Sequence, residues 1–257
     1  EHLERATGGS DGDSDKHTIS VWVKRTELSN GTNTYIMGFN GGRLRFETND
    51  IIEYQFRSGK KLETTAKFRD TSAWYHIVVV ANSDESTASD RMKLYVNGVQ
   101  ITDFTTAVYQ DLGQGSPLWG KYSLYNLRVG GAGSYDSNKG INGYLAEVYY
   151  IDGQTLSPTS FGEFDEDSGI WKPKAFTGTF GSLDTYLDFS DSSNLGKNSG
   201  GTTDLAATNI TAADQATDTP TNNFATLNPL HYTTRYTITE GGTNQVSSAN
   251  GWGASVG

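Results

Sequence analysis

The feature that most constrains this chain is a set of short stretches in which apolar and polar residues alternate with a period of two. In the clearest stretch, Ile19, Val21 and Val23 lie on one face of the strand. In a later stretch, Met92, Leu94 and Val96 do the same. Successive side chains of a β-strand point to opposite sides, so this alternation indicates half-buried strands. Lys, Glu, Leu and Ala do not recur together at the 3.6-residue spacing of an amphipathic helix. The pattern therefore predicts an all-β fold.

Turn signals between the stretches predict how the strands pair. Asn40-Gly41-Gly42 separates two short strand candidates, and Asn97-Gly98 follows the candidate strand over 92–96. An Asn-Gly pair adopts the positive φ angles of a type I′ hairpin turn at low cost. The apolar run at 74–80 is expected to pair with 92–96, and a third strand is expected to fold back after Gly98. These signals predict antiparallel sheets.

Composition and charge exclude several classes of protein. The chain has 257 residues, no cysteine and a formal net charge of −10. Without cysteine there are no disulfides and no thiolate metal sites. The one dense basic stretch is residues 57–61. Because phosphate contacts dominate the affinity of proteins for nucleic acid, we do not expect nucleic acid as a partner. A run of about 18 apolar residues is absent, so no membrane partner is expected.

Three blocks carry a resemblance to a known fold family. They are "TISVWVKR" (18–25), "AWYHIVVVANS" (73–83) followed by "RMKLYVNGVQI" (91–101), and "GYLAEVYYIDGQTLSP" (143–158). Together they resemble the laminin-G-like, concanavalin A-like jelly-roll domain, over about residues 1–165. The resemblance implies a two-sheet antiparallel jelly-roll sandwich with a concave face, and frequently a calcium or glycan site at one rim. An extended C-terminal segment would follow.

A narrower resemblance concerns the second half of the chain. The segments "SPTSFGEFDEDSGIWKPK" (157–174), "YLDFSD" (186–191) and "DTPTNNFATLNP" (218–229) are similar to virion proteins of tailed, especially marine, bacteriophages. The resemblance implies a non-enzymatic fibre, appendage or capsid-decoration module, located in the virion or outside the cell. The implied partners are host cell-surface glycans, other virion subunits or further copies of the chain.

The domain organisation follows from shifts in composition. We expect a laminin-G-like domain over 1–170 and an extended Ser/Thr/Asn-rich linker with one short strand over 171–230. The short strand is expected at 186–189. Renewed alternation after Tyr232 predicts that 231–257 begins a further β module. The chain is therefore expected to be a piece of a longer protein.

Candidate carbohydrate-binding residues come from aromatic side chains in polar, Gly-rich loops. Sugar C–H faces stack on aromatic rings, while hydroxyl groups meet Asn, Asp and Gln. The candidates are Trp119, Tyr122, Tyr125, Tyr135 and Asn138. The same aromatic residues would also serve to pack against a neighbouring subunit or to cover the sheet, so three readings stay open.

Calcium is the one metal that the sequence suggests. Asp11, Asp13 and Asp15 place hard oxygen ligands at every second residue, and Asp136 lies in a later loop. An EF-hand would need Gly at position 16, which is Lys, and Glu at position 22, which is Trp. The alternatives are therefore a generic loop site and a set of capped turns.

Enzyme chemistry has little support in the sequence. The nearest match to a glucanase pair of acids, Glu163 to Ser168, has Ser where the second Glu is needed, and glycines flank it as in a loop. His76 is expected to be a hydrogen-bonded sheet histidine rather than a general base. The chain is therefore expected not to be an enzyme. A capsule- or polysaccharide-degrading enzyme on a jelly-roll scaffold is the alternative.

Overall fold

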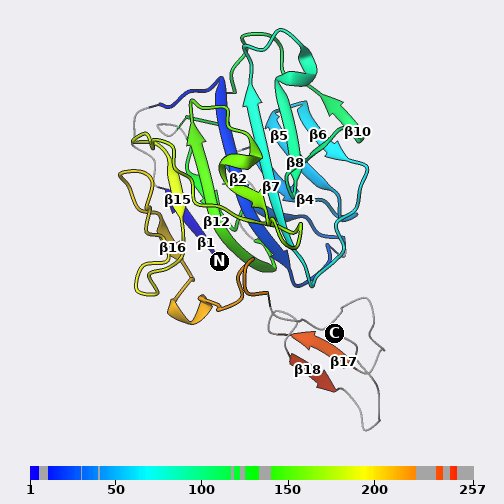
Figure 1. Ribbon diagram of the computed structural model, residues 1–257, viewed down its shortest axis with the longest axis vertical. Coiled ribbons are helices and arrows are strands. Elements are labelled where there is room, and N and C mark those ends of the chain that lie inside the picture. Colours follow the sequence, from blue (N-terminus) through cyan, green and yellow to red (C-terminus); the bar gives the residue numbers. More distant parts are fainter. Residues whose placement is uncertain are drawn as a thin grey trace.

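Two antiparallel β-sheets stacked face to face form the body of the protein (Figure 1). The structure is a computed structural model. It describes residues 1–5, 11–29, 31–39, 41–116, 119–121, 125–132, 140–223, 236–239 and 244–247. The all-β antiparallel sandwich predicted from the alternation is confirmed.

The smaller of the two main sheets has six strands. Its order is β15 (Thr185–Leu187), β12 (Gly143–Asp152), β2 (Lys16–Arg25), β7 (Trp74–Asn82), β8 (Met92–Val96) and β9 (Val99–Ile101). The turn between β8 and β9 has φ of 49° at Asn97 and 79° at Gly98, as the Asn-Gly signal predicts.

The second sheet has eight strands. Its order is β10 (Phe104–Val108), β6 (Lys60–Thr64), β5 (Ile52–Arg57), β4 (Arg43–Phe46), β3 (Thr34–Gly38), β11 (Leu127–Val129), β1 (His2–Arg5) and β16 (Ala206–Thr208). Two hairpins complete the described strands: β13 (Gly162–Phe164) with β14 (Trp171–Pro173), and β17 (Tyr236–Thr239) with β18 (Asn244–Ser247).

Three short 3-10 helices are the helical elements of the described residues. They are η1 (Ala88–Asp90), η2 (Pro158–Ser160) and η3 (Ala212–Asp214). Within that part of the chain, no helix has the length and apolar character needed to cross a lipid bilayer.

The core lies between the two sheets and follows the alternation of the strands. Ile19, Val21 and Val23 of β2 are fully buried in it, opposite residues such as Leu44 and Phe46 of β4. The intervening residues of β2 point outward, yet they are buried as well. One of them, Trp22, forms a cluster with Trp74 of β7 and with Trp171, which β14 brings over this face of the sheet.

The segment after residue 171 adds strands to both sheets. β15 pairs with β12, and β16 pairs with β1. The short strand expected at 186–189 thus occupies 185–187, and β14 and β16 occur in addition to it. A Ser/Thr/Asn-rich stretch buries little apolar surface alone, but the edge of a formed sheet supplies its backbone with hydrogen-bond partners. The expected boundary at residue 230 lies outside the described residues.

Candidate functional site

Trp119, the first candidate for sugar stacking, lies in the core and not on the surface. Its side chain is 0% exposed, and its ring stacks against Tyr150 at a centroid distance of 6.0 Å. Its indole Nε1 donates a hydrogen bond to the carbonyl of Gln55 at 3.0 Å. Because that carbonyl satisfies the indole N–H, the whole ring can be buried. The expectation that Trp119 stacks on a sugar is therefore wrong.

Of the other four carbohydrate candidates, the structure describes one. Tyr125 is half-buried and packs against the core. Tyr122, Tyr135 and Asn138 lie outside the described residues, so they stay predictions.

The burial of Trp119 leads to a stability prediction. Replacing Trp119 with Phe should lower the free energy of unfolding by about 2 kcal/mol, because it removes the Nε1 hydrogen bond and leaves a small cavity. Urea denaturation would measure the change. Glycan binding should be unaffected, and a loss of binding with unchanged stability would return Trp119 to the ligand site.

The three acids proposed for calcium point to separate partners. Asp13 Oδ1 accepts hydrogen bonds from the backbone N of Asp15 and of Lys16, and Asp15 Oδ1 accepts one from the Ser83 hydroxyl. Asp11 contacts Lys121 at 3.4 Å. These are capped turns and ion pairs, so the structure does not bring Asp11, Asp13 and Asp15 together as one cation site. Asp136 lies outside the described residues.

His76 is the hydrogen-bonded sheet histidine that the sequence analysis expects. Its Nδ1 accepts a hydrogen bond from Trp171 Nε1 at 2.8 Å, and its Nε2 lies 2.8 Å from the Ser20 hydroxyl. Because an indole nitrogen only donates, Nε2 carries the proton and donates to Ser20. Burial lowers the pKa of His76 to about 3, so the ring is neutral near pH 7. Both nitrogens are occupied, which disfavours a role as general base.

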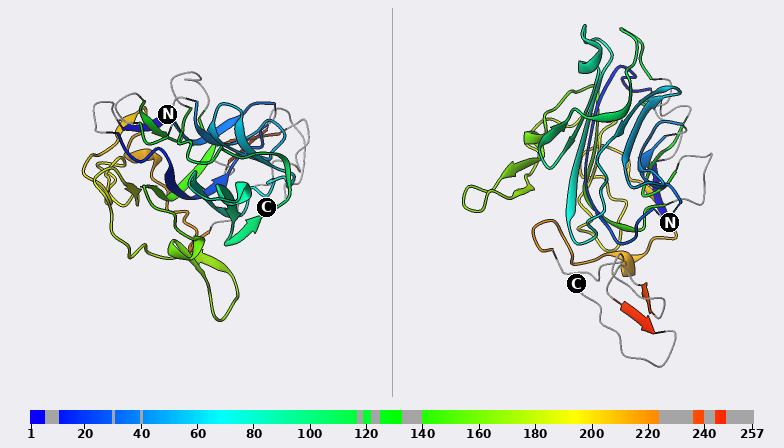
Figure 2. Two further views of the ribbon diagram at one scale, coloured as in Figure 1. Left: turned by 90° about the horizontal axis from the view of Figure 1, so that it is seen from above. Right: turned by 90° about the vertical axis from the view of Figure 1, so that its right-hand side faces the viewer.

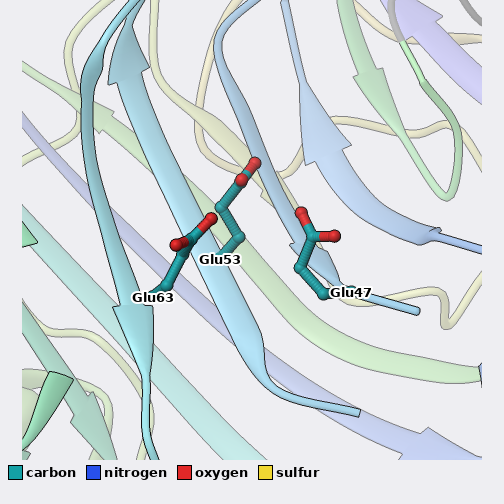
Figure 3. Close-up of side chains that lie close together, drawn as sticks. All are labelled: Glu47, Glu53 and Glu63. Carbon is teal, nitrogen blue, oxygen red and sulfur yellow. The ribbon is translucent and has the colours of Figure 1, made fainter. Parts of the chain in front are cut away.

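A charged cluster that the sequence analysis did not single out lies on the eight-stranded sheet. Alternation sends Leu44, Tyr54 and Leu62 into the core, and it turns the intervening residues of β4, β5 and β6 toward the opposite face. The register places Glu53 directly opposite Arg45 on one neighbouring strand and Glu63 on the other. Glu47 follows β4 directly. Figure 3 shows these three glutamates turned toward one another.

The geometry of this cluster, which we call the glutamate cluster, is tight. One carboxylate oxygen from each of Glu47, Glu53 and Glu63 lies within 4.8 Å of the others. Among the described residues, this is the one group of three acids that meets this distance. The side chain of Glu53 is 1% exposed, whereas those of Glu47 and Glu63 are each 17% exposed.

Three cations compensate the three carboxylates. Glu53 is contacted by Arg43, by Arg45 Nε at 3.2 Å and by Lys61 Nζ at 3.7 Å. Arg45 also pairs with Glu47, and Lys61 pairs with Glu63. Arg45 donates a further hydrogen bond to the Tyr35 hydroxyl at 2.6 Å. The cluster is a dense layer of hydrogen-bond donors and acceptors with balanced charge.

The surroundings push the pKa values of Glu47 and Glu53 in opposite directions. Burial raises the pKa of Glu47, and a hydrogen bond to Glu53 adds to the rise. Burial would also raise the pKa of Glu53, but the hydrogen bond and charge of Arg43, together with Arg45, lower it. When the pair holds one proton, Glu47 carries it.

The chemistry of the cluster suits a neutral polar ligand better than a metal. Carboxylate oxygens are the ligands that calcium prefers, but Arg43, Arg45 and Lys61 already bind these oxygens. A divalent cation would meet three positive charges, so the residues present do not fit calcium. A sugar hydroxyl both donates and accepts, and it can therefore pair with either partner of such ion pairs.

The order of residues in β4 and β6 contains a signal for this cluster that is not visible in the overall composition. In Arg43-Leu44-Arg45-Phe46 and Lys61-Leu62-Glu63, charged residues occupy every second position of a strand. Charge at these positions marks the outer face of a sheet. The register between β4, β5 and β6 is still needed to show that the charges meet.

These features define the class of the protein: an antiparallel jelly-roll sandwich with a lectin/glucanase-like, carbohydrate-binding fold. Residues 5–159 match the concanavalin A-like lectin/glucanases superfamily, which is more than half of the chain, and the chain belongs to that family. The resemblance noted in the sequence is confirmed at this level. No curated protein matches the sequence.

Several solved structures are similar in fold to this chain. A heptameric SAP-like pentraxin from Limulus polyphemus is 15% identical, with a TM-score of 0.41 over 61% of this chain and 71% of that one. A putative carbohydrate binding protein from Bacteroides ovatus is also 15% identical, with a TM-score of 0.43 over 72% of this chain and 52% of that one. Domain 4 of the arabinanase AbnA from Geobacillus stearothermophilus is 16% identical, with a TM-score of 0.40 over 62% and 69%.

Proposed function

We propose that this chain is a non-enzymatic module of a tailed-phage virion that attaches to host surface glycans and takes part in subunit assembly. The membership of the concanavalin A-like lectin/glucanases superfamily supports the glycan half of the proposal. The similarity of 157–174, 186–191 and 218–229 to phage virion proteins supports the virion half. The module would act outside the cell, on the particle.

The observation that carries the glycan proposal is the glutamate cluster with its cations. It places Arg43, Arg45 and Lys61 beside three carboxylates on a sheet face turned away from the core. A neutral hexose presents hydroxyl groups, each of which can donate to a carboxylate and accept from a cation of such a layer. The balanced charge favours a neutral glycan over a strongly anionic one.

Replacing Arg43 with Ala should weaken glycan binding about tenfold or more, because charged hydrogen bonds of this kind contribute about 1.5–3 kcal/mol. Arg43 is the choice because its side chain is 24% exposed and can reach a ligand. A glycan array, followed by titration calorimetry on the best hit, would measure the effect. Lys93→Ala is the matched control, since Lys93 lies on the other sheet and forms a surface ion pair with Asp90 of η1. Equal binding by both variants would move the glycan site elsewhere.

A polysaccharide-degrading enzyme is the second candidate, and the three close carboxylates favour it. A retaining glycosidase needs one carboxyl group that holds a proton and one that is ionised, as the opposite pKa shifts of Glu47 and Glu53 provide. Against this, Glu53 is 1% exposed and bound by three cations, so it has no open path to a sugar carbon. We therefore favour binding without catalysis.

A reducing-end assay on host polysaccharide separates the two candidates. We expect no release of reducing ends by the native chain above the level of a Glu53→Gln variant. Steady product formation by the native chain, abolished by Glu53→Gln, would establish the enzyme instead. Adjacent capsid or tail genes in the source genome would test the virion half independently.

A further inference from the structure

Exposed apolar side chains gather at two places on the surface. Among the described residues, the large apolar side chains that are most exposed are Val99 (60%), Val108 (41%), Leu112 (60%), Phe164 (56%) and Ile170 (66%). Phe164 and Ile170 belong to the β13–β14 hairpin, and Val99 follows Gly98, which packs closely against Trp171 of that hairpin. Val108 and Leu112 lie at and just beyond the end of β10. Contiguous apolar groups that are left in water commonly mark a contact surface.

The first place is the β13–β14 hairpin, which we call the arm. It projects from the outer side of the six-stranded sheet, yellow-green in both views of Figure 2. Its base is anchored by Trp171, which is 8% exposed and whose ring lies 4.8 Å from that of Phe164. The backbone N–H of Asp165 donates to the carbonyl of Ile170 at 2.8 Å, and Phe164 pairs with Trp171, so Phe164 and Ile170 are exposed on opposite faces of the hairpin.

The arm carries excess negative charge. Lys172 contacts Asp165 at 2.9 Å and Glu163 at 3.8 Å, and Lys174 contacts Glu163 at 3.7 Å. Glu166 and Asp167 at the tip form no ion pair with other described residues. The arm therefore presents two apolar side chains beside two uncompensated carboxylates.

The second place, which we call the edge patch, lies at the free edge of the eight-stranded sheet, where Figure 1 labels β10. Val108 lies opposite Lys61 on β6. Leu112 follows Asp111, which Lys60 contacts at 2.9 Å. The hydrogen bond from Lys60 lowers the pKa of Asp111, and the charges of Arg57 and Arg91 lower it further.

The charge of the edge patch is unusual for this protein. The whole chain has a net charge of −10, yet Arg57, Lys60 and Arg91 outnumber Asp111 at this position. Two exposed apolar side chains thus lie in a locally positive region. The arm has the opposite arrangement, two exposed apolar side chains and a locally negative tip.

We propose that the arm of one copy of this chain docks on the edge patch of a second copy. Phe164, Ile170, Val108 and Leu112 would all become buried at this contact, while Glu166 and Asp167 would meet Arg57 and Lys60. The two surfaces are different parts of the molecule, so the contact is heterologous and each copy can both provide an arm and receive one. This inference rests on the assembly half of the proposed function and is independent of its glycan half.

Analytical ultracentrifugation of the full chain tests the proposal. The native chain should show a mass that rises with concentration and falls as salt is added, because salt screens exposed charges. An arm variant, Phe164→Ser with Ile170→Ser, should raise the dissociation constant for self-association about tenfold or more. An edge variant, Val108→Thr with Leu112→Ser, should do the same. All four positions are exposed, so both variants should keep the native melting temperature.

Mixing the two variants gives the sharpest readout. The arm variant retains an intact edge patch, and the edge variant retains an intact arm. An equimolar mixture should therefore form a one-to-one dimer that neither variant forms alone. A Glu166→Lys, Asp167→Lys variant should likewise lose assembly and regain it with an Arg57→Glu, Lys60→Glu variant. Glu27→Lys, at an exposed carboxylate outside both surfaces, is the matched charge control.

Two results would overturn the inference. One is a native chain that stays monomeric at every concentration and salt level. The other is a native chain that assembles while the variant mixture stays monomeric, which would assign assembly to another surface. Glycan binding measured on the same variants separates the two parts of the proposed function, since neither the arm nor the edge patch includes Arg43.

Discussion

Replacing Asp218 with Ala should lower the free energy of unfolding by about 3–5 kcal/mol, because it removes the carboxylate that compensates the buried charge of Lys24. The Lys24 side chain is 0% exposed, and its ammonium contacts Asp218 Oδ2 and Asn223 Oδ1 at 2.7 Å each. Asp218 also accepts a hydrogen bond from Trp74 Nε1 at 2.9 Å. Urea denaturation of the native chain and the variant would measure the difference.

A double variant distinguishes the effect of an uncompensated buried charge from a general loss of packing. Changing Lys24 to Met together with Asp218→Ala removes both charges, so most of the lost stability should return. Asp191→Ala is a matched control, because its contact with Lys197 at 3.8 Å lies at the surface and should contribute little.

The same experiment tests how firmly the C-terminal segment belongs to the sandwich. Asp218 lies almost 200 residues after Lys24, and Asn223 also bonds the backbone of Ser72 at 2.8 Å. A loss below about 1 kcal/mol would mean that 216–223 is a loosely attached linker, as exposed ion pairs contribute no more than that. A loss of the predicted size would make it an integral part of the domain.

Lowering the pH from 7 to 5 should cost about 4 kcal/mol of stability through His17 and His76 together. Burial lowers the pKa of each histidine to about 3, from an ordinary value of 6.5. Between these values the unfolded chain binds protons that the folded chain does not, so stability falls as the pH falls. Each histidine then contributes about 2 kcal/mol over this interval. Denaturation at a series of pH values would measure the slope.

Asp152 opposes this trend. Burial raises its pKa to about 6, and the charges of Asp184 and Asp13 add to the rise. The folded chain therefore takes up a proton on Asp152 before the unfolded chain does, which returns about 1 kcal/mol between pH 7 and pH 5. An Asp152→Asn variant should consequently show a steeper loss than the native chain. A stability that is flat from pH 7 to pH 5 in that variant would contradict the neutral, buried state of the two histidines.

The local parts of the fold could be predicted from the sequence. The apolar run at 74–80 forms β7, and the stretch at 92–96 forms β8 with the same bounds. The Asn97-Gly98 turn joins β8 to β9, and His76 is a satisfied sheet histidine. Each of these depends on neighbouring residues or on the alternation of a single strand.

The candidate site was harder to predict, because it depends on contacts between strands. Trp119 stands in a polar, Gly-rich stretch that is typical of a surface loop, yet the carbonyl of Gln55 receives its N–H inside the core. Glu47, Glu53 and Glu63 are unremarkable acids in the sequence. They meet only because β5 pairs with β4 on one side and β6 on the other.

The sequence by itself determined the class of the fold, the positions of most strands and the face of each strand that is buried, because alternation and turn chemistry act over a few residues. The tertiary structure alone decided which strands are neighbours: β12 lies beside β2, and the late strands β15 and β16 complete the two sheets. The physical reason is that backbone pairing has nearly the same chemistry for every strand. Register and burial across the whole sandwich, not local residue type, therefore decide where the charged cluster, the arm and the edge patch lie.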